Sequence, residues 1–177
     1  MRLHLGCGHR FIPGFTHVDA VPHPHVDLVH SVDVLPMVPD GAADLVYACH
    51  VLEHFHRREV SRVLGEWFRV LRPGGTLRLS VPDFDALAEV YDRTSDLNLI
   101  IGPLFGRGDY LYNIHHTVFD HVTLAAALAA AGFASPCRYD WRQTEHADVD
   151  DYSQAYLPHL DRDGGILISL NMEATKP

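Results

Sequence analysis

The chain has 177 residues, a length that suits one domain with a sizeable buried core. Hydrophobic residues make up 47% and charged residues 21%, which is typical of a globular protein and excludes a disordered or fibrous one. The net charge of −9, counted with neutral histidine, leaves no basic surface for a phosphate backbone, so we expect no nucleic-acid partner.

The cysteines and the apolar runs indicate the compartment. The three cysteines, Cys7, Cys49 and Cys137, are widely spaced and form no C-x-x-C pair, which favours a reducing environment over a disulfide framework. No apolar run is long enough to span a membrane, and the first residues lack the core of a signal peptide. We therefore expect a soluble, cytoplasmic protein that does not bind membranes.

Short strands dominate the first half of the chain. Four apolar runs predict them, at 3–5, 16–19, 26–29 and 44–49. From Arg57 to Leu71 the apolar residues recur at helical spacing, and the turn residues Pro73, Gly74 and Gly75 end this helix.

Strands and helices continue to alternate in the second half. We predict strands at 76–81, 134–142 and 165–173, and helices at 84–91, after Asp83 as N-cap, and at 120–131. Residues 94–116 show no steady period and are predicted as a long loop or lid, and residues 143–165 as irregular. This order predicts a single α/β domain over residues 1–177, a three-layer sandwich with a mostly parallel sheet and an antiparallel C-terminal edge.

Two glycines and one aspartate are placed for ligand binding. Gly6 and Gly8 directly follow the first strand, where the backbone must turn tightly and a ligand can approach closely. Asp19 ends the next strand, and an acidic residue at this position can accept hydrogen bonds from ribose hydroxyls. The alternative for Asp19 is a carboxylate that only caps a turn.

The order of the motifs resembles the class I S-adenosylmethionine-dependent methyltransferases, in particular the small methyltransferase type 11 group. The resemblance covers most of the chain and implies a Rossmann-like fold. Its five motifs are Leu5 to Gly8, Gly14 to Asp19, Asp33 to Pro36, Asp44 to His54, and Val70 to Gly75.

The resemblance implies S-adenosylmethionine as the cofactor and gives roles to matching residues. Residues 6–8 would wrap the methionine portion, and Asp19 would hold the ribose. Asp33 and Val34 would hold the adenine, and His50 would line the sulfonium end. The full cofactor-binding set is Gly6, Cys7, Gly8, His9, Asp19, Ala20, Asp33, Val34, Leu35 and His50.

Two features depart from the family pattern. Only ten residues separate Gly8 from Asp19, so the helix usual at this place is at most a turn or two, and His9 or Arg10 would supply the missing contacts. The chain also begins at the first strand, without the N-terminal helix that commonly covers the acceptor in this family. We expect the cover to come from residues 94–116 or from a second subunit, as in a homodimer.

The 14 histidines require that metal binding be weighed. The segment from His50 to His54 matches H-x-x-E-H, the inverted zinc-protease pattern, in which two histidines and a glutamate share one helix face. Here the segment follows a predicted strand without a helix cap, and L-E-H is ordinary in the family that the chain resembles. We therefore expect neither proteolysis nor a metal site.

Three residues of the predicted lid are candidates for catalysis: His115, His116 and Tyr112. Methyl transfer is an in-line displacement in which positioning contributes most, and a base is needed when the nucleophile carries a proton of high pKa. Histidine suits that role near neutral pH. The alternative is a surface pair that caps the next helix. Tyr47 and Tyr110 could also face the sulfonium, although tyrosines near a sheet edge more often pack.

These motifs predict methyl transfer to an oxygen or nitrogen nucleophile of a small molecule, such as a sugar, a glycan precursor or a secondary metabolite. Two alternatives keep the cofactor. The first is an enzyme of this fold that cyclises or cleaves S-adenosylmethionine and releases methylthioadenosine. The second is an inactive, cofactor-binding partner of another subunit. A nicotinamide dehydrogenase shares the glycine and acid pattern but lacks the motif that ends at Gly75.

Overall fold

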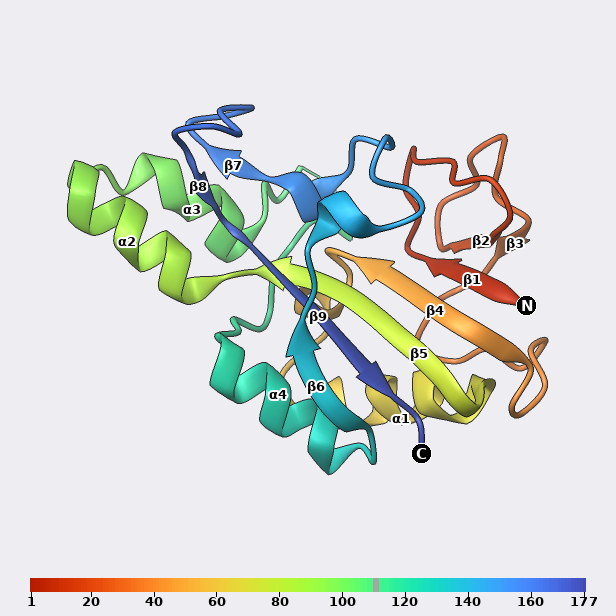
Figure 1. The fold of residues 1–177 in the computed structure, drawn as a ribbon. Coiled ribbons are helices and arrows are strands. Elements are labelled where there is room, and N and C mark those ends of the chain that lie inside the picture. Colours follow the sequence, from red (N-terminus) through yellow and green to blue (C-terminus); the bar gives the residue numbers. More distant parts are fainter. Residues whose placement is uncertain (110–111) are drawn as a thin grey trace.

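The computed structural model describes residues 1–109 and 112–177, which form one twisted sheet with helices and irregular segments packed on it (Figure 1). Within these residues a seven-stranded sheet has the order β3-β2-β1-β4-β5-β9-β6, and β7 and β8 form a separate pair. The strands are β1 Arg2–Leu5, β2 Thr16–Asp19, β3 Leu28–Val29, β4 Ala43–Cys49, β5 Leu71–Pro82, β6 Ala134–Arg138, β7 Tyr156–Leu157, β8 Ile166–Leu167 and β9 Ser169–Thr175.

Strands β1 to β5 run parallel, and β9 runs antiparallel to both of its neighbours, β5 and β6. The register places Leu5 opposite Val18 on one side and opposite Ala48 on the other. All three side chains are buried, as parallel strands covered on both faces require. The predicted fold class, a mostly parallel sheet with an antiparallel C-terminal edge, is confirmed.

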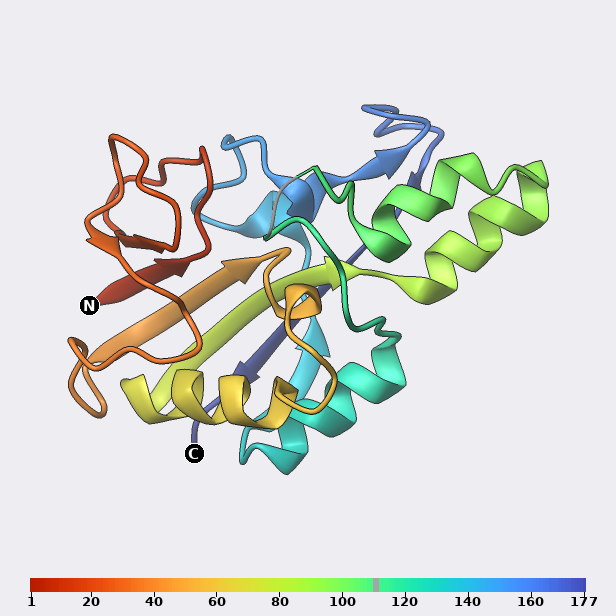
Figure 2. The same ribbon diagram turned by 180° about the vertical axis from the view of Figure 1, so that it is seen from behind.

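Helices cover one face of the sheet. The helices are α1 Val60–Val70, α2 Phe84–Thr94, α3 Asn98–Phe105 and α4 His121–Ala130, and α1 and α4 lie side by side across this face (Figure 2). Val60, Val63, Leu64 and Trp67 line the buried side of α1, at the spacing that predicted the helix. Asp120 begins α4 with a reciprocal capping box to Thr123.

The pair α2 and α3 extends beyond the carboxyl end of β5 (Figure 1). Asp83 caps α2 as predicted, because its carboxylate accepts a hydrogen bond from the backbone N–H of Asp85 at 3.2 Å. Residues 94–116, predicted as one long loop, contain α3. Ile100 packs against Leu87 and Val90 of α2, and this burial outweighs the helix-breaking residue Pro103 within α3.

The opposite face is covered by a segment with little regular structure, residues 139–155, which includes the short 3-10 helices η2 Trp141–Gln143 and η3 Tyr152–Gln154. This face of the sheet carries polar side chains that are almost fully buried, among them His4, His17 and Tyr47. Tyr47 contacts His146 of this segment, whereas His17 is covered by Phe11 and Ile12. The hydroxyl of Tyr47 donates a hydrogen bond to Asp151 at 2.5 Å. Burial raises the pKa of Tyr47 well above its ordinary value, so this hydroxyl stays a donor.

One turn prediction needs correction. The Pro-Gly-Gly motif lies within β5 rather than between a helix and a later strand, because β5 already begins at Leu71. The pairing with β4 shifts register there, and Gly74 adopts φ +75°. A Cβ at Gly75 would lie 2.9 Å from the carbonyl oxygen of Arg72, so only glycine fits this bulge. Among the helices that the structure describes, none has the length and apolar character that a membrane span requires.

Candidate functional site

The candidate site lies where the parallel strands β2, β1 and β4 end. Asp19, the turn at residues 6–8 and His50 follow or end these three adjacent strands, so they meet at the carboxyl edge of the sheet (Figure 1). Ligands of open α/β sheets bind at this edge. Residues 6–15 form turns without an α-helix, as the short spacing before Asp19 predicts.

The glycine turn after β1 has two different glycines. Gly6 has φ +62° and Gly8 has φ +52°, both in the left-handed region that favours glycine. A Cβ at Gly6 would lie 2.5 Å from a methyl carbon of Val51, whereas a Cβ at Gly8 would meet nothing within 4 Å. Gly6 therefore packs the turn against the segment after β4, and Gly8 leaves open space beside the backbone.

Asp19 links the ends of β1 and β2. Its carboxylate accepts hydrogen bonds from the backbone N–H of Gly8 at 2.7 Å and of Val21 at 2.8 Å. The residue is buried, with 8% of its surface exposed. A carboxylate has about four acceptor positions, so two backbone donors orient this group and leave positions for a ligand's hydroxyl groups.

The other predicted residues near the glycine turn differ in exposure. Cys7 is buried, and burial is the largest effect that raises the pKa of its thiol to about 12, so it is a packing residue and not a nucleophile. Its Sγ lies 3.8 Å from Nε2 of His25. His9 is exposed and its ring contacts that of His23, and Ala20 is partly buried next to Asp19.

The residues predicted to bind adenine already have partners within the protein. Arg62 donates a hydrogen bond to the carboxylate of Asp33 at 2.8 Å, and the backbone N–H of Leu35 donates to Glu66 at 2.5 Å. The side chain of Leu35 belongs to the core, while that of Val34 is exposed. The adenine contacts of these residues stay a prediction.

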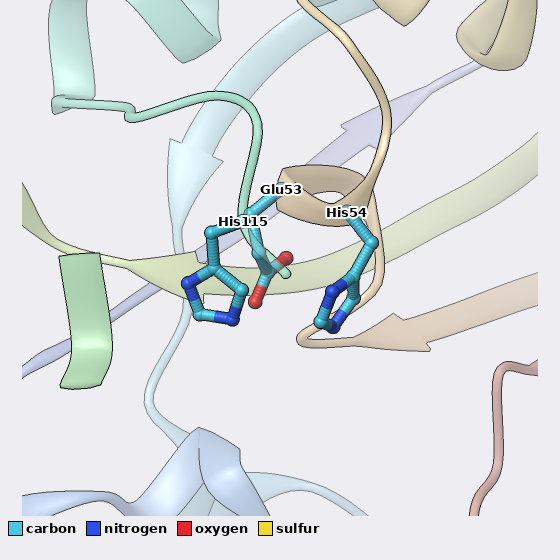
Figure 3. Close-up of side chains that lie close together, drawn as sticks. All are labelled: Glu53, His54 and His115. Atoms are coloured by element: carbon cyan, nitrogen blue, oxygen red, sulfur yellow. The ribbon is translucent and has the colours of Figure 1, made fainter. Parts of the chain in front are cut away.

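A polar group of side chains follows β4 (Figure 3). His50 has φ +54°, and its Nε2 lies 2.9 Å from the hydroxyl of Ser169. Its Nδ1 lies 3.1 Å from Oε1 of Glu53, which is completely buried. Burial by itself raises the pKa of Glu53, but the rings of His50, His54 and His115 together hold it below its ordinary value.

Of the predicted catalytic residues, His115 belongs to this group. His115 faces Glu53 and His54 (Figure 3), and burial is the main cause that lowers the pKa of its imidazole. His116 is exposed, although its backbone N–H donates to the carbonyl of Glu53 at 2.8 Å. Tyr112 is exposed as well. Tyr110 lies outside the described residues.

Sequence reasoning missed Glu53 and His54 as site residues. The segment folds as the 3-10 helix η1 Leu52–His54, which is three residues long. His50 to His54 therefore do not form the α-helix face that the zinc-protease pattern requires. The signal that could have found the site was the H-x-x-E-H sequence together with His115. The fold brings these parts together through hydrogen bonds that no sequence period reveals.

A family model described as a methyltransferase domain matches residues 16–79, which run from β2 through most of β5. A probable S-adenosylmethionine-dependent methyltransferase of Mycolicibacterium smegmatis is 39% identical over 62 residues. These residues are 34% of this chain and 23% of that protein, so the match covers less than a quarter of the relative.

Solved methyltransferase structures share the fold. The 1,6-didemethyltoxoflavin-N1-methyltransferase of Burkholderia thailandensis, solved with 1,6-didemethyltoxoflavin and S-adenosylhomocysteine, has a TM-score of 0.60 and 21% identity over 98% of this chain and 69% of its own. A Thermotoga maritima protein described as a possible histamine N-methyltransferase has a TM-score of 0.55 and 15% identity over 92% of this chain and 74% of its own. The family model thus supports the resemblance identified from the motifs over residues 16–79, and the solved structures support its fold over most of the chain.

Proposed function

We propose that the chain is a class I S-adenosylmethionine-dependent methyltransferase, and that it transfers the methyl group of this cofactor to an oxygen or nitrogen atom of a small molecule. The observation that carries the proposal is the hydrogen bond between Gly8 and Asp19. This hydrogen bond holds the carboxyl ends of β1 and β2 together, next to the polar residues that follow β4.

The residues at this edge fit the cofactor. The open space at Gly8 admits a ligand close to the backbone, and the oriented carboxylate of Asp19 can accept hydrogen bonds from both ribose hydroxyls. When bound, S-adenosylmethionine supplies a methyl group on a positively charged sulfur. His50, which directly follows β4, the strand next to β1, would border the sulfonium end.

The acceptor would lie against the polar group after β4. His50, Glu53 and His115 provide charged and hydrogen-bonding atoms there, while a net charge of −9 disfavours a nucleic-acid acceptor. The Burkholderia thailandensis methyltransferase that shares the fold was solved with a small molecule. Residues 94–116 would supply the cover, since His115 donates its backbone N–H to the carbonyl of Phe105 in α3 at 3.0 Å.

A product assay tests the proposal. The protein is incubated with S-adenosylmethionine, alone and with pools of hydroxylated and amino-bearing small molecules, and the sulfur nucleotides are quantified by mass spectrometry. We expect S-adenosylhomocysteine to form only when an acceptor is present, and the Asp19→Ala variant to form much less. Methylthioadenosine released without acceptor would instead support cleavage of the cofactor. If the protein binds the cofactor but shows no turnover with any pool, and turnover begins only when a second protein is added, the inactive-partner alternative is supported.

A further inference from the structure

Three potential metal ligands meet beside the proposed acceptor position. Glu53 and His54 belong to η1, and His115 comes from the segment between α3 and α4 (Figure 3). One ligand atom of each residue lies within 4.8 Å of the ligand atoms of the other two. We call these three residues the Glu53 cluster.

Glu53 is the unusual member of the cluster. Its side chain is 0% exposed, and neither carboxylate oxygen accepts a hydrogen bond of good geometry from the residues that the structure describes. Nδ1 of His50 lies 3.1 Å from one of these oxygens, and Nε2 of the same ring lies 2.9 Å from the hydroxyl of Ser169. A buried carboxylate without hydrogen bonds is costly, and a cation at this place would supply the missing partner.

Hydrogen bonds of the two histidines prepare both rings for a metal. Nδ1 of His115 lies 2.8 Å from the carbonyl oxygen of Pro103, and Nδ1 of His54 lies 3.1 Å from the carbonyl oxygen of Ile114. Because a carbonyl oxygen only accepts, each Nδ1 carries the proton and each Nε2 keeps its lone pair. Metal-binding histidines in proteins are commonly oriented by such a contact of the other ring nitrogen.

The backbone holds the two segments of the cluster together. The carbonyl of Glu53 accepts hydrogen bonds from the backbone N–H of His116 at 2.8 Å and of Thr117 at 3.2 Å. The hydroxyl of Thr117 donates to the carbonyl of Phe55 at 2.7 Å. The ligands therefore come from segments already fixed to each other, so binding an ion requires little ordering of the chain.

We propose that Glu53, His54 and His115 bind one divalent transition-metal ion. Two imidazole nitrogens and one carboxylate oxygen suit Zn²⁺, Co²⁺ or Fe²⁺ better than Ca²⁺ or Mg²⁺, which prefer oxygen ligands only. Three protein ligands leave coordination positions open, as catalytic metal sites do.

The position of the cluster suggests its use, and this part rests on the proposed methyl transfer. An acceptor hydroxyl bound to the ion would have a lowered pKa and release its proton to water. Its oxygen would then form the new bond to the methyl carbon while the bond from that carbon to sulfur breaks, which leaves neutral S-adenosylhomocysteine. His115 would thus act as a ligand and not as the predicted base.

Cobalt titration of the chelator-treated protein tests the metal site. Co²⁺ bound to nitrogen and oxygen ligands gives visible absorption bands, and calorimetry gives the stoichiometry. We expect one Co²⁺ per chain for the wild type, and at least about tenfold weaker binding for Glu53→Gln and His115→Ala. The matched control is His56→Ala, an exposed histidine of the same loop, which should bind like the wild type.

Two further controls keep the result clear. The double variant His23→Ala/His25→Ala removes two histidines of a separate group, next to Cys7, and should leave the Co²⁺ bands unchanged. Should Glu53→Gln fail to fold, as judged by circular dichroism, His54→Ala takes its place. No Co²⁺ bands in the wild type, or bands lost only in the double variant, would overturn the metal site. S-adenosylhomocysteine binding, measured without metal, reports separately on the proposed function.

Discussion

Gly6 and Gly8 have the same left-handed backbone but different surroundings, and this difference separates folding from ligand binding. Gly6 is closed in by the branched side chain of Val51, which cannot easily move aside. Gly8 faces open space where the cofactor is proposed to lie.

Alanine at each glycine should therefore have a different effect. We expect Gly6→Ala to lower the free energy of unfolding by about 3 kcal/mol, through left-handed strain and the contact with Val51. Gly8→Ala should cost only about 1 kcal/mol of stability, from the strain alone, but weaken S-adenosylhomocysteine binding. Urea denaturation and calorimetry measure the two effects. Equal stability of the two variants would contradict the assignment of Gly6 to packing.

The place of a single residue could be predicted where its position on a strand decides that place. Asp19 lies at the strand end where the motif predicts it, and its partner is the predicted glycine turn. The sequence could not show that Leu35 would use its backbone N–H for Glu66, or that Glu53 would meet His115. Such contacts join segments far apart in the chain and depend on the final packing.

At the scale of the elements, α1 illustrates what periodicity predicts well. Its apolar residues recur at helical spacing, and the structure buries that side of the helix against the sheet. Trp67 is the largest of them, is completely buried, and donates a hydrogen bond from Nε1 to the carbonyl of Val32 at 2.9 Å. The helix thereby anchors the segment between β3 and β4.

Replacement of Trp67 should destabilise the fold strongly. We expect Trp67→Ala to lower the free energy of unfolding by about 3 to 5 kcal/mol, because it leaves a cavity and an unpaired buried carbonyl at Val32. Trp67→Phe fills most of the space and should cost less. Urea denaturation gives both values. A loss below about 1 kcal/mol for Trp67→Ala would contradict the buried position of this side chain.

Element boundaries were predicted less well than element types. The bulge at Gly75 places the Pro-Gly-Gly motif inside β5, although these residues usually punctuate structure. Helix α3 was missed because Gly102 and Pro103 oppose it, and burial of Ile100 against α2 decides the outcome. Tertiary contacts override local preference at both places.

At the scale of the whole molecule, the alternation of strands and helices predicted a sheet with a layer on each face, but not that one of these layers would be an irregular segment. One face has α1 and α4, as expected. The other is covered by residues 139–155, whose sequence has no period, and buries polar side chains such as His4, Tyr47 and His146. This polar layer has a consequence for the stability of the protein.

Stability should fall in mild acid. Burial lowers the pKa of His4 to about 3, far below that of the unfolded chain. Between about pH 6.5 and pH 3, this histidine binds a proton in the unfolded chain but not in the folded protein. A fall in pH within this range therefore lowers the free energy of unfolding. His4 alone should remove roughly 2 kcal/mol from the free energy of unfolding at pH 5 compared with pH 7.5.

Urea denaturation at pH 7.5 and pH 5 measures this loss, and His4→Leu provides the comparison. Leucine does not bind a proton in either state, so the free energy of unfolding of the variant should decrease between pH 7.5 and pH 5 by roughly 2 kcal/mol less than that of the wild type. His146, whose pKa burial lowers to about 4, contributes in the same direction and remains in the variant. An unchanged free energy of unfolding across this range would show that these rings accept protons in the folded protein.

The central claim is that the ends of β1 and β2 bind the cofactor through Asp19, and calorimetric titration with S-adenosylhomocysteine tests it most directly. We predict one molecule per chain, and binding about 10- to 100-fold weaker for Asp19→Ala, since hydrogen bonds to a charged group contribute about 1.5 to 3 kcal/mol. Asp44→Ala is the matched control, because the carboxylate of Asp44 also accepts a hydrogen bond, from the N-terminal amino group at 2.7 Å, but near the start of β4, away from the strand ends that carry Asp19. Wild-type protein that does not bind S-adenosylhomocysteine, or an Asp19→Ala variant that binds it as tightly, would contradict the claim.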